Sequence, residues 1–299
     1  MSNYHTPALL QECIDGLNIK PDGIYVDVTF GGGGHSKEIL KKLGNNGRLI
    51  AFDQDTDARK NIFEDERFIF IHSNFRYIKN YLKYYNIQKV DGILADLGIS
   101  SFHIDAQSRG FSFKANSKLD MRMNKEMRKT AADLLNEYAE KDLIKLFRQY
   151  GEIKNAGGLA KQIVSARKEK QFSNIEDFVE TIKNKTPKRF ENKYLAKVFQ
   201  AIRIELNDEI GALEDFLHAT GDLINKNGRL VILSYHSLED RYVKNYIRSG
   251  NCSGTINKDI YGNYETPLKY VNKKVIIPTE EEIQNNPRSR SAKLRIAEK

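Results

Sequence analysis

The sequence predicts an α/β protein in which a doubly wound, mostly parallel sheet is interrupted by an all-helical insertion. Between residues 24 and 97, short apolar runs alternate with amphipathic segments, a pattern typical of βαβ units. From about residue 111 to 207, apolar residues recur every three or four positions, as they do in helices. We therefore expect residues 1–108 and 210–299 to share one sheet-containing domain, with residues 109–209 forming an inserted helical domain.

The first half of the expected sheet holds strands and helices in alternation. The stretch GIYVDVTF (23–30) is typical of a buried strand, and HSKEILKKLG (35–44) of a helix that ends at a glycine. A turn and a second strand ending at Asp53 follow. Further along, the pattern predicts a helix at 55–65, a strand at 67–75, a helix at 76–86 and a strand at 90–98.

The inserted segment is expected to be helical throughout. Its amphipathic stretches lie at 130–138, 140–150, 157–168, 175–184 and 194–206. A helix at 210–224 and an apolar strand at 227–237 then return the chain to the sheet. The C-terminal stretch NPRSRSAKLRIAEK (286–299) is expected to be a basic tail.

Composition and charge narrow the class of protein. No apolar run approaches the roughly 18 residues that a membrane span needs, and no secretory or transit pattern opens the chain, so we expect a cytoplasmic protein. Lys and Arg outnumber Asp and Glu by 48 to 40, which favours a polyanionic partner. Cys13 and Cys252 lie far apart without metal-ligand spacing, so neither a disulfide framework nor a metal site is expected.

The stretch VDVTFGGGGHS (26–36) is the strongest local signal. It places four glycines after a buried strand, where ligands of open parallel sheets bind. Such a loop can hold a phosphate, hold the sugar of a nucleotide, or simply make a turn. No Gly-Lys-Ser/Thr ends the run, which excludes a Walker loop. Four glycines are entropically costly without a ligand or close packing, which disfavours a plain turn.

Two nucleotide sites remain compatible with the loop. A dinucleotide site, as in a nicotinamide-dependent dehydrogenase, would use Gly31, Gly33 and a third small residue at position 36, which is Ser36 here. An S-adenosylmethionine site needs an acid in the first strand, a glycine turn, an acid that closes the second strand and a polar cluster after the fourth. Asp27, Asp53 and Asp96 supply these acids, so the pattern favours a methyltransferase.

Eight sequence blocks, taken in order, resemble the bacterial RsmH (MraW) family of ribosomal RNA small-subunit methyltransferases. They are YVDVTFGGGGHS, FDQDTDA, DGILADLGISS, RGFSF, LDMRMN, FQAIRIELNDE, RLVILSYHSLEDRYVK and NPRSRSAKLRIAEK. The resemblance implies a class I S-adenosylmethionine-dependent methyltransferase fold with an inserted helical domain. It implies transfer of a methyl group from S-adenosylmethionine to the N4 amine of a cytosine in the decoding (P-site) region of 16S rRNA.

The resemblance also implies which residues contact the cofactor. Where the family often has Gln, this chain has His103, which departs from the family pattern. The residues implied are Gly33, Gly34, His35, Asp53, Phe75, Asp96 and His103, and the strand pattern adds Asp27.

The chemistry requires hydrogen-bond acceptors for the amine protons, because the lone pair of the exocyclic nitrogen is delocalised into the ring. Asp96, after the fourth strand, and His236, in SYHSLEDR, are the candidates. Many amino-group methyltransferases place a double-proline patch after the fourth strand, and its absence here weakens the alternative of a DNA amino-group methyltransferase. Asp96 can therefore serve the cofactor, the amine, or both.

The expected partner is 16S rRNA in the small ribosomal subunit, and a homodimer remains open. Basic side chains near the expected site or in the tail are the candidates for RNA contact: Arg109, Arg122, Arg288, Arg290, Lys293 and Arg295.

Overall fold

A computed structural model describes residues 7–100, 106–183 and 190–299. The chain divides into two compact units. The sheet unit comprises Met1–Gly98 and Gly211–Lys299, and the helical unit comprises Ile99–Ile210. The first border follows residue 98, ten residues before the expected 108, so the segment after the fourth strand groups with the helices. The second border lies after residue 210, one residue beyond the expected 209.

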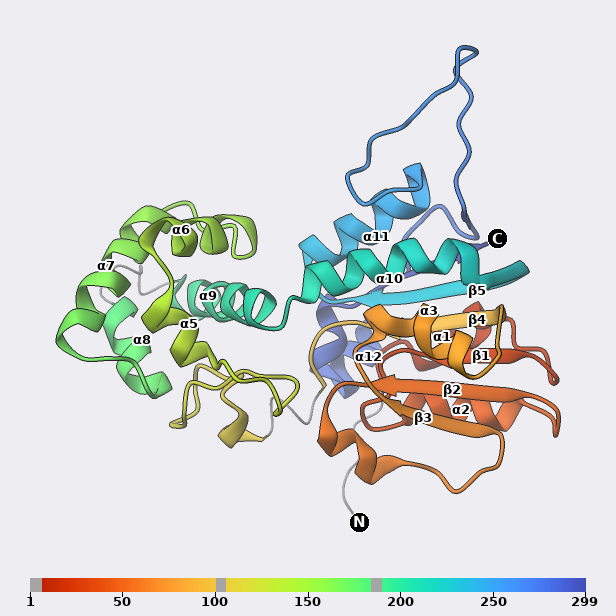
Figure 1. Ribbon diagram of the computed structural model, residues 1–299, viewed down its shortest axis with the longest axis horizontal. Coiled ribbons are helices and arrows are strands. Elements are labelled where there is room, and N and C mark those ends of the chain that lie inside the picture. Colours follow the sequence, from red (N-terminus) through yellow and green to blue (C-terminus); the bar gives the residue numbers. More distant parts are fainter. Residues whose placement is uncertain (1–6, 101–105, 184–189) are drawn as a thin grey trace. The chain divides into compact units, whose positions relative to one another are not determined.

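The sheet unit contains a seven-stranded sheet of order β3-β2-β1-β4-β5-β7-β6 (Figure 1). Neighbouring strands from β3 to β5 are parallel, whereas β7 runs antiparallel to both β5 and β6. The predicted mostly parallel α/β sheet is thus confirmed. The strands are β1 (Ile24–Asp27), β2 (Arg48–Asp53), β3 (Phe68–His72), β4 (Val90–Asp96), β5 (Ile224–Ser234), β6 (Lys269–Tyr270) and β7 (Lys293–Glu298).

Helices cover both faces of this sheet, so successive residues of a central strand enter two different cores. In β2, Ile50 packs with residues of α3, α10 and α11, whereas Leu49 packs with residues of α1 and α2. This alternation is the period of two that a strand imposes on its side chains. The helices are α1 (Leu10–Leu17), α2 (Gly34–Lys42), α3 (Ile78–Tyr84), α10 (Glu209–Leu223), α11 (Ser237–Ser249) and α12 (Glu280–Asn285), with 3-10 turns η1 (Thr56–Asn61), η2 (Phe75–Tyr77) and η5 (Pro287–Ser291).

The helical unit has its own apolar core, which confirms the predicted helical insertion. The core includes Leu143 and Phe147 of α6, Ile163 of α7 and Phe178 of α8, all buried. The α6 side chains face inward because they recur at the three- to four-residue spacing of one helix face. The elements are η3 (Gln107–Arg109), α5 (Ala131–Glu137), α6 (Glu140–Gln149), α7 (Ala156–Glu169), α8 (Ile175–Lys183) and α9 (Glu191–Leu206).

Two expected elements differ from the structure. The helix expected at 55–65 is only a 3-10 turn over Thr56–Asn61, capped by the Asp55 carboxylate, which accepts the Asp57 N–H. The basic tail is not a free tail, because residues 293–298 form β7 between β5 and β6. Leu294 and Ile296 alternate with charged residues along it and enter the core, which explains why charge obscured the strand pattern.

None of the helices in the described parts of the chain is both long and apolar enough to cross a membrane.

Candidate active site

The glycine loop follows β1 at the carboxyl edge of the sheet. The Gly33 N–H donates to the Phe30 carbonyl over 2.7 Å, and the Phe30 N–H donates to the Phe52 carbonyl of β2. Gly31 and Gly33 have φ of +51° and +76°, in the left-handed region that glycine tolerates. A Cβ on Gly33 would also lie 2.8 Å from the Phe63 ring. Glycine is therefore required at position 33 by both conformation and space.

Asp53, at the end of β2, fixes the position of this loop. Its Oδ2 accepts the Gly31 N–H over 2.7 Å, and its Oδ1 accepts the Asp55 N–H over 2.8 Å. The Asn61 side chain donates to the Gly31 carbonyl over 2.9 Å. The first strand-to-helix loop is thus tied to the end of the neighbouring strand, where a nucleoside ribose would be expected.

Asp27 is buried beneath the loop and is held by neutral donors. The Ser36 hydroxyl donates to its Oδ2 over 2.7 Å, and the Thr29 N–H donates to its Oδ1 over 3.0 Å. Burial raises the pKa of Asp27 to about 6, against the lowering effect of these hydrogen bonds. Ser36, which weakened the dinucleotide pattern, is therefore a specific partner of the strand carboxylate.

Asp96 ends β4 and lies close to the same network. Its backbone N–H donates to the Thr29 hydroxyl over 2.7 Å, so one threonine contacts residues of both β1 and β4. The Tyr235 hydroxyl, just after β5, donates to Asp96 Oδ1 over 2.8 Å. The Asp96 side chain retains 23% exposure, and burial raises its pKa to about 7, although the Tyr235 hydrogen bond acts to lower it.

His35 lies buried at the start of α2. Its Nδ1 is 3.9 Å from Asp96 Oδ2. Burial lowers the pKa of His35 to about 4, so the imidazole is neutral at pH 7 and does not neutralise the carboxylate. Gly34 precedes it, and a Cβ there would lie 2.4 Å from Pro7. These contacts pack the loop against the N-terminal segment.

Similarity to other proteins decides the family. Residues 2–299 match the model of the MraW methylase family. The ribosomal RNA small subunit methyltransferase H of Bacteroides fragilis is 55% identical over 100% of this chain and 98% of its own length. The protein of the same name from Phocaeicola vulgatus is 56% identical over 99% of this chain and 97% of its own length. An rRNA methylase structure from Streptococcus thermophilus has a TM-score of 0.41 and 12% identity, over 97% of this chain and 93% of that chain.

The chain belongs to the MraW methylase family. S-adenosylmethionine is the methyl donor of this family, and the acids at the carboxyl edge fit it. Asp27, Asp53 and Asp96 suit a cationic sulfur and donating hydroxyl groups, whereas they would repel a pyrophosphate. The same acids therefore disfavour the nicotinamide dinucleotide alternative.

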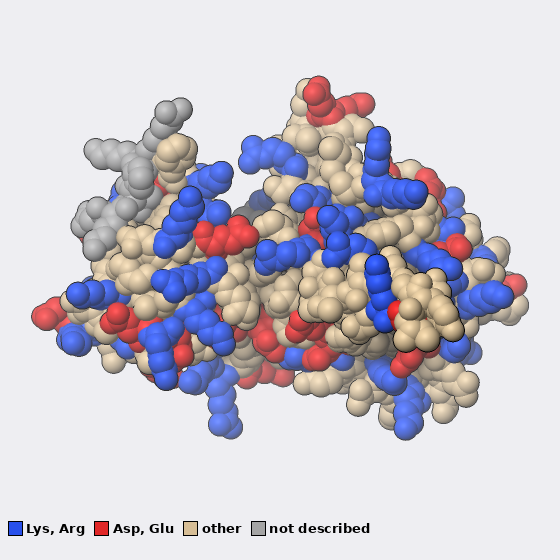
Figure 2. Space-filling model, turned by 90° about the horizontal axis from the view of Figure 1, so that it is seen from above, with Lys and Arg blue, Asp and Glu red and all other residues tan. Residues whose placement is uncertain are grey.

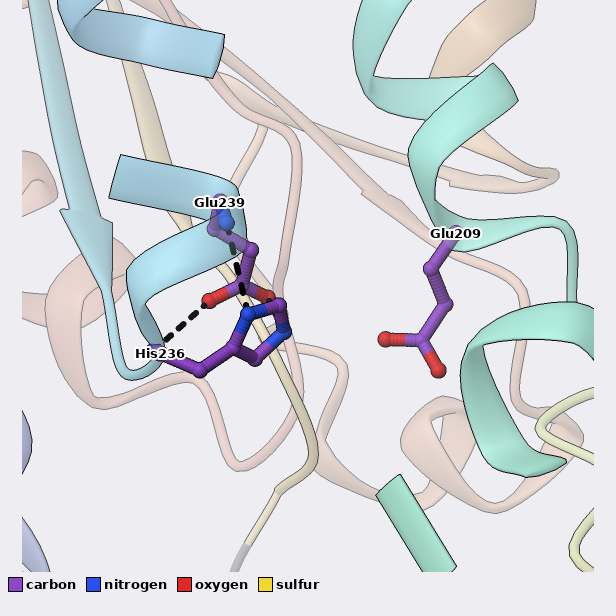
Figure 3. Close-up of side chains that lie close together, drawn as sticks. All are labelled: Glu209, His236 and Glu239. Atoms are coloured by element: carbon purple, nitrogen blue, oxygen red, sulfur yellow. Dashed lines mark hydrogen bonds and ion pairs between the residues drawn. The ribbon is translucent and has the colours of Figure 1, made fainter. Parts of the chain in front are cut away.

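In this MraW methylase, His236 forms the N-terminal cap of α11 (Figure 3). Its Nδ1 accepts the Glu239 N–H over 3.3 Å, and its Nε2 lies 3.1 Å from Glu239 Oε1. The Glu239 carboxylate in turn accepts the backbone N–H groups of Tyr235 and His236. This capping box holds the loop that carries Tyr235, and a catalytic role for His236 stays a prediction.

Phe75 and His103 complete the expected cofactor contacts. Phe75 opens η2 after β3, and its ring packs edge-on against Phe216 of α10 with centroids 5.4 Å apart. It is partly buried, so its proposed contact with the cofactor stays a prediction. His103 lies outside the described residues.

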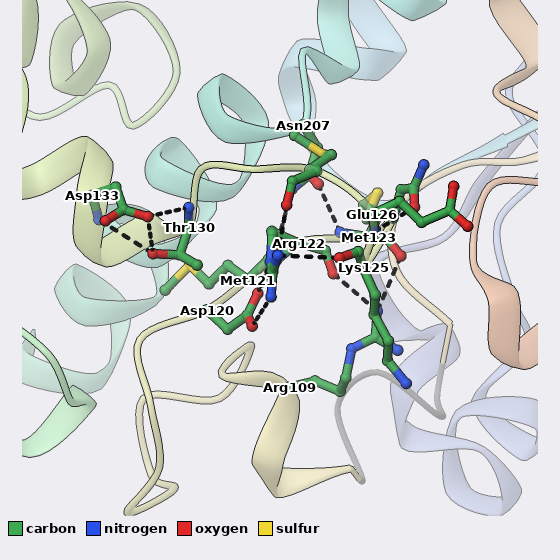
Figure 4. Close-up of polar contacts among 12 residues, drawn as sticks. Arg109, Asp120, Met121, Arg122, Met123, Lys125, Glu126, Thr130, Asp133 and Asn207 are labelled. Carbon is green, nitrogen blue, oxygen red and sulfur yellow. Dashed lines mark hydrogen bonds and ion pairs between the residues drawn. The ribbon is translucent and has the colours of Figure 1, made fainter.

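Arg109 and Arg122, expected to contact RNA, hold the loop before α5 in the helical unit (Figure 4). Arg122 binds both carboxylate oxygens of Asp120 at 2.8 Å, and its Nη1 donates to the carbonyls of Lys125 and Met127. The buried guanidinium of Arg109 donates to the carbonyls of Arg122 and Met123. These contacts give both arginines a structural role, and their contact with RNA stays a prediction.

The basic residues near the C-terminus fall into two kinds. Arg288 and Arg290 are exposed on η5. Arg295 and Lys293 on β7 instead bind the Asp240 carboxylate of α11, at 2.7 and 3.4 Å. A cavity of about 320 Å³ opens between α11 and these elements. Its walls are formed by Tyr235, His236, Ser237, Ile277, Pro278, Ile283, Arg290, Ser291, Ala292 and Lys293.

Three residues that hydrogen-bond to candidate site residues or to the loop beside them were not predicted from the sequence. They are Thr29, Tyr235 and Glu239. Glu239 follows His236 by three residues, which is the spacing of a capping box and could have been detected. Tyr235 lies inside the quoted SYHS block, directly after an expected strand. Thr29 gave no signal, because its contact with Asp96 depends on β1 and β4 lying side by side.

Proposed function

We propose that the protein transfers a methyl group from S-adenosylmethionine to the N4 amine of a cytosine in the decoding region of 16S rRNA. The observation that carries this proposal is the similarity, over the full length of both chains, to proteins named ribosomal RNA small subunit methyltransferase H. The resemblance of the eight sequence blocks supplies the cytosine and its position. The carboxylates around the glycine loop support a role for this edge in the transfer.

The cofactor side of the site would use the glycine loop and two acids. When bound, S-adenosylmethionine supplies an electrophilic methyl group on a positively charged sulfur. Asp53, at the end of β2, would accept hydrogen bonds from ribose hydroxyls while it holds the Gly31 N–H. Asp27 holds Ser36 and Thr29 and adds negative charge below the loop. Gly33, Gly34 and His35 would form the part of the loop that contacts the cofactor.

The target side would use the exposed part of Asp96. Its Oδ1 accepts the Tyr235 hydroxyl, which fixes the orientation of the carboxylate, so Oδ2 can accept an amine proton of cytosine. Such a hydrogen bond favours a pyramidal nitrogen whose lone pair can attack the methyl carbon. As the nitrogen–carbon bond forms, the sulfur–carbon bond of the donor would break and neutral S-adenosylhomocysteine would leave. The N4 cation that results is acidic, and its proton would pass to Asp96 or to water. Most of the rate enhancement would then come from positioning.

A direct assay tests this function. The protein is incubated with labelled S-adenosylmethionine and small subunits from a strain that lacks the activity, and the nucleosides are analysed by mass spectrometry. We expect N4-methylated cytidine from the wild type and none from Asp53→Ala. A wild-type protein that binds S-adenosylmethionine but yields no methylated cytidine contradicts the proposal.

The proposal also includes the setting in which the protein acts. Small ribosomal subunits are cytoplasmic in bacteria, so we propose action in the cytoplasm. Fractionation of cells tests this location, and a membrane-bound active protein would contradict it. A homodimer stays open, and light scattering of the purified protein distinguishes a monomer from a dimer.

A further inference from the structure

A projecting arm leaves the sheet unit between α11 and β6. We define the arm as residues 253–266; in Figure 1 it is the blue loop that extends beyond α11. Its two ends are fixed, because Cys252 and Leu268 are buried in the core that α10 and α11 share with the sheet. The Asn245 side chain donates to the Cys252 carbonyl over 3.0 Å, and Arg248 donates to the Gly254 carbonyl.

The tip of the arm is an ordered turn. The Asp259 N–H donates to the Asn263 carbonyl over 2.8 Å, and the Gly262 N–H donates back to the Asp259 carbonyl over 3.0 Å. The Asp259 Oδ1 also accepts the N–H groups of Tyr261 and Asn263. Gly262 has φ of +84°, which glycine tolerates. The turn therefore holds Ile260 and Tyr261 at its apex.

Both apex side chains are exposed to solvent. Ile260 is 91% exposed and Tyr261 is 82% exposed, and Tyr264 nearby is 45% exposed. Isolated apolar residues are common on protein surfaces, but here adjacent large side chains are held outward by a hydrogen-bonded turn. The turn costs conformational entropy without burying them, which is expected of a surface that binds a partner.

Between residues 253 and 274 the chain has four lysines against two acids, Asp259 and Glu265, and this excess favours a polyanionic partner. Lys258 lies beside the apex, and Lys269, Lys273 and Lys274 follow the arm; all four are exposed. Within the described ranges, none of these lysines is in an ion pair. The Asp259 carboxylate, in contrast, is engaged in the turn. Figure 2 looks down on the side from which the arm projects and shows many Lys and Arg side chains on that face, with Asp and Glu side chains among them.

We propose that the arm binds an unpaired segment of small-subunit rRNA, with Tyr261 stacking on a base and the neighbouring lysines contacting phosphates. The inference rests on the proposed function, which supplies RNA as the substrate. Stacking on aromatic side chains is how proteins recognise unpaired bases, and lysines add the salt-dependent attraction to the backbone. Ile260 packs beside the stacked base and shields it from water.

Matched tyrosine variants test the arm. The affinity of the full-length protein for small subunits is measured for Tyr261→Ala, Tyr261→Phe and Tyr84→Ala. Tyr84 is the control because it is 77% exposed and belongs to α3, outside the arm. We expect Tyr261→Ala to raise Kd about tenfold, the loss of one stacked base, and Tyr261→Phe to stay within about twofold because the ring remains. Tyr84→Ala should match the wild type, and all variants should bind S-adenosylmethionine as the wild type does.

A second measurement identifies the partner. A photo-crosslinking benzoylphenylalanine at position 260 should attach to 16S rRNA in the small subunit. Attachment to a ribosomal protein, or none at all, overturns the proposal. The double variant Lys273→Ala/Lys274→Ala should also reduce the slope of log K against log salt by about 1.4. An unchanged slope would show that these lysines do not contact phosphates.

The outcome can be separated from that of the proposed function. If the wild type produces no methylated cytidine, yet Tyr261→Ala still weakens binding to small subunits, the RNA-binding role of the arm is supported and the proposed activity is contradicted. If the wild type methylates cytidine and Tyr261→Ala binds small subunits as tightly as the wild type, the proposed activity is supported and the RNA-binding role of the arm is contradicted.

Discussion

Asp96 in the sheet unit and Asp120 in the helical unit are both partly buried, but their environments have opposite effects. Burial raises the pKa of Asp96 to about 7, and the donor that faces it is the neutral hydroxyl of Tyr235. Burial also acts to raise the pKa of Asp120, but the paired guanidinium of Arg122 outweighs it and the pKa is lowered.

The difference separates an acid that stabilises the fold from one that is available for chemistry. Asp120 gains a bidentate cation, so its charge contributes to the structure of the loop before α5. Asp96 is held by a neutral donor instead, and we propose that its carboxylate serves the substrate or the cofactor. A buried acid held by neutral donors is the arrangement in which shifted pKa values indicate a functional site. Five changes test this comparison.

Asp96→Asn should have the largest effect. It removes the charge that would accept the amine proton while keeping the shape of the side chain, so we expect the single-turnover rate to fall about 100-fold or more. The affinity for S-adenosylmethionine, measured by calorimetry, should change less than the rate. The exposed Asp22→Asn in the same unit is the control, and equal loss of rate by both variants would exclude a specific role for Asp96.

Arg122→Met should destabilise the helical unit without a direct effect on chemistry. It leaves the Asp120 carboxylate and two carbonyls without their donor, which we expect to cost about 2–3 kcal/mol in the free energy of unfolding. Urea unfolding measures this loss. Arg128→Ala, an exposed arginine in the same unit, should change stability by less than about 0.5 kcal/mol. Similar stability of Arg122→Met and the wild type would show that the contacts in Figure 4 contribute little.

The stability of Asp96→Asn relative to the wild type should depend on pH. The folded-state pKa of Asp96, about 7, lies above its ordinary value of 3.8, so ionisation of Asp96 destabilises the cofactor-free fold as pH rises from about 4 to 7. Asn cannot ionise, and the variant should gain relative stability across this window and level off above it.

Measuring this difference is preferable to measuring the wild type alone. The pKa of buried His35, lowered to about 4, contributes the opposite trend between about 4 and 6.5 in both proteins and cancels. Thermal unfolding at several pH values provides the test, and a constant difference between the two proteins would contradict the raised pKa.

Tyr235→Phe should move the acidic limb of the activity profile. In the wild type, kcat/KM should fall about tenfold per pH unit below an apparent pKa near 7, as Asp96 takes up a proton. The Tyr235 hydrogen bond lowers this pKa, so its loss should shift the limb to higher pH. A limb that stays in place, or moves to lower pH, would mean that another group titrates.

Arg290→Ala should have the smallest effect. Arg290 is exposed on η5, so its loss should weaken binding to small subunits a few-fold and reduce the salt slope by about one. Arg295→Ala should instead cost stability, about 1–2 kcal/mol, because it leaves Asp240 without its nearest cation. If the slope of log K against log salt is equal for Arg290→Ala and the wild type, Arg290 on η5 does not contact RNA phosphates.

The sequence predicted the sheet and its acids because their signals are local. Asp27, Asp53 and Asp96 each end an apolar strand, and parallel strands bring such ends to one edge of the sheet. The Thr29 and Tyr235 contacts were missed because they join segments that only strand pairing brings together. Asp96 lies beside Leu233 of β5, more than a hundred residues away in sequence.

The arginines were harder to interpret because charge alone does not indicate what it faces. Asp120 lies two residues before Arg122, and that spacing signalled a local pair that the emphasis on RNA contact overlooked. In the same way, the basic residues at 293 and 295 concealed a strand whose alternate side chains are apolar. Exposure and partner identity, which separate Arg290 from Arg295, come only from the folded chain.

The pairing of β4 with β5 has a kinetic consequence. These strands are neighbours in the sheet, yet the whole helical unit lies between them in the chain, so their association must close a long loop. Early folding of the helical unit on its own core would shorten the flexible part of that loop and lower its closure entropy. A weakened arginine contact in the insertion would then slow the assembly of the sheet, even though it touches no strand.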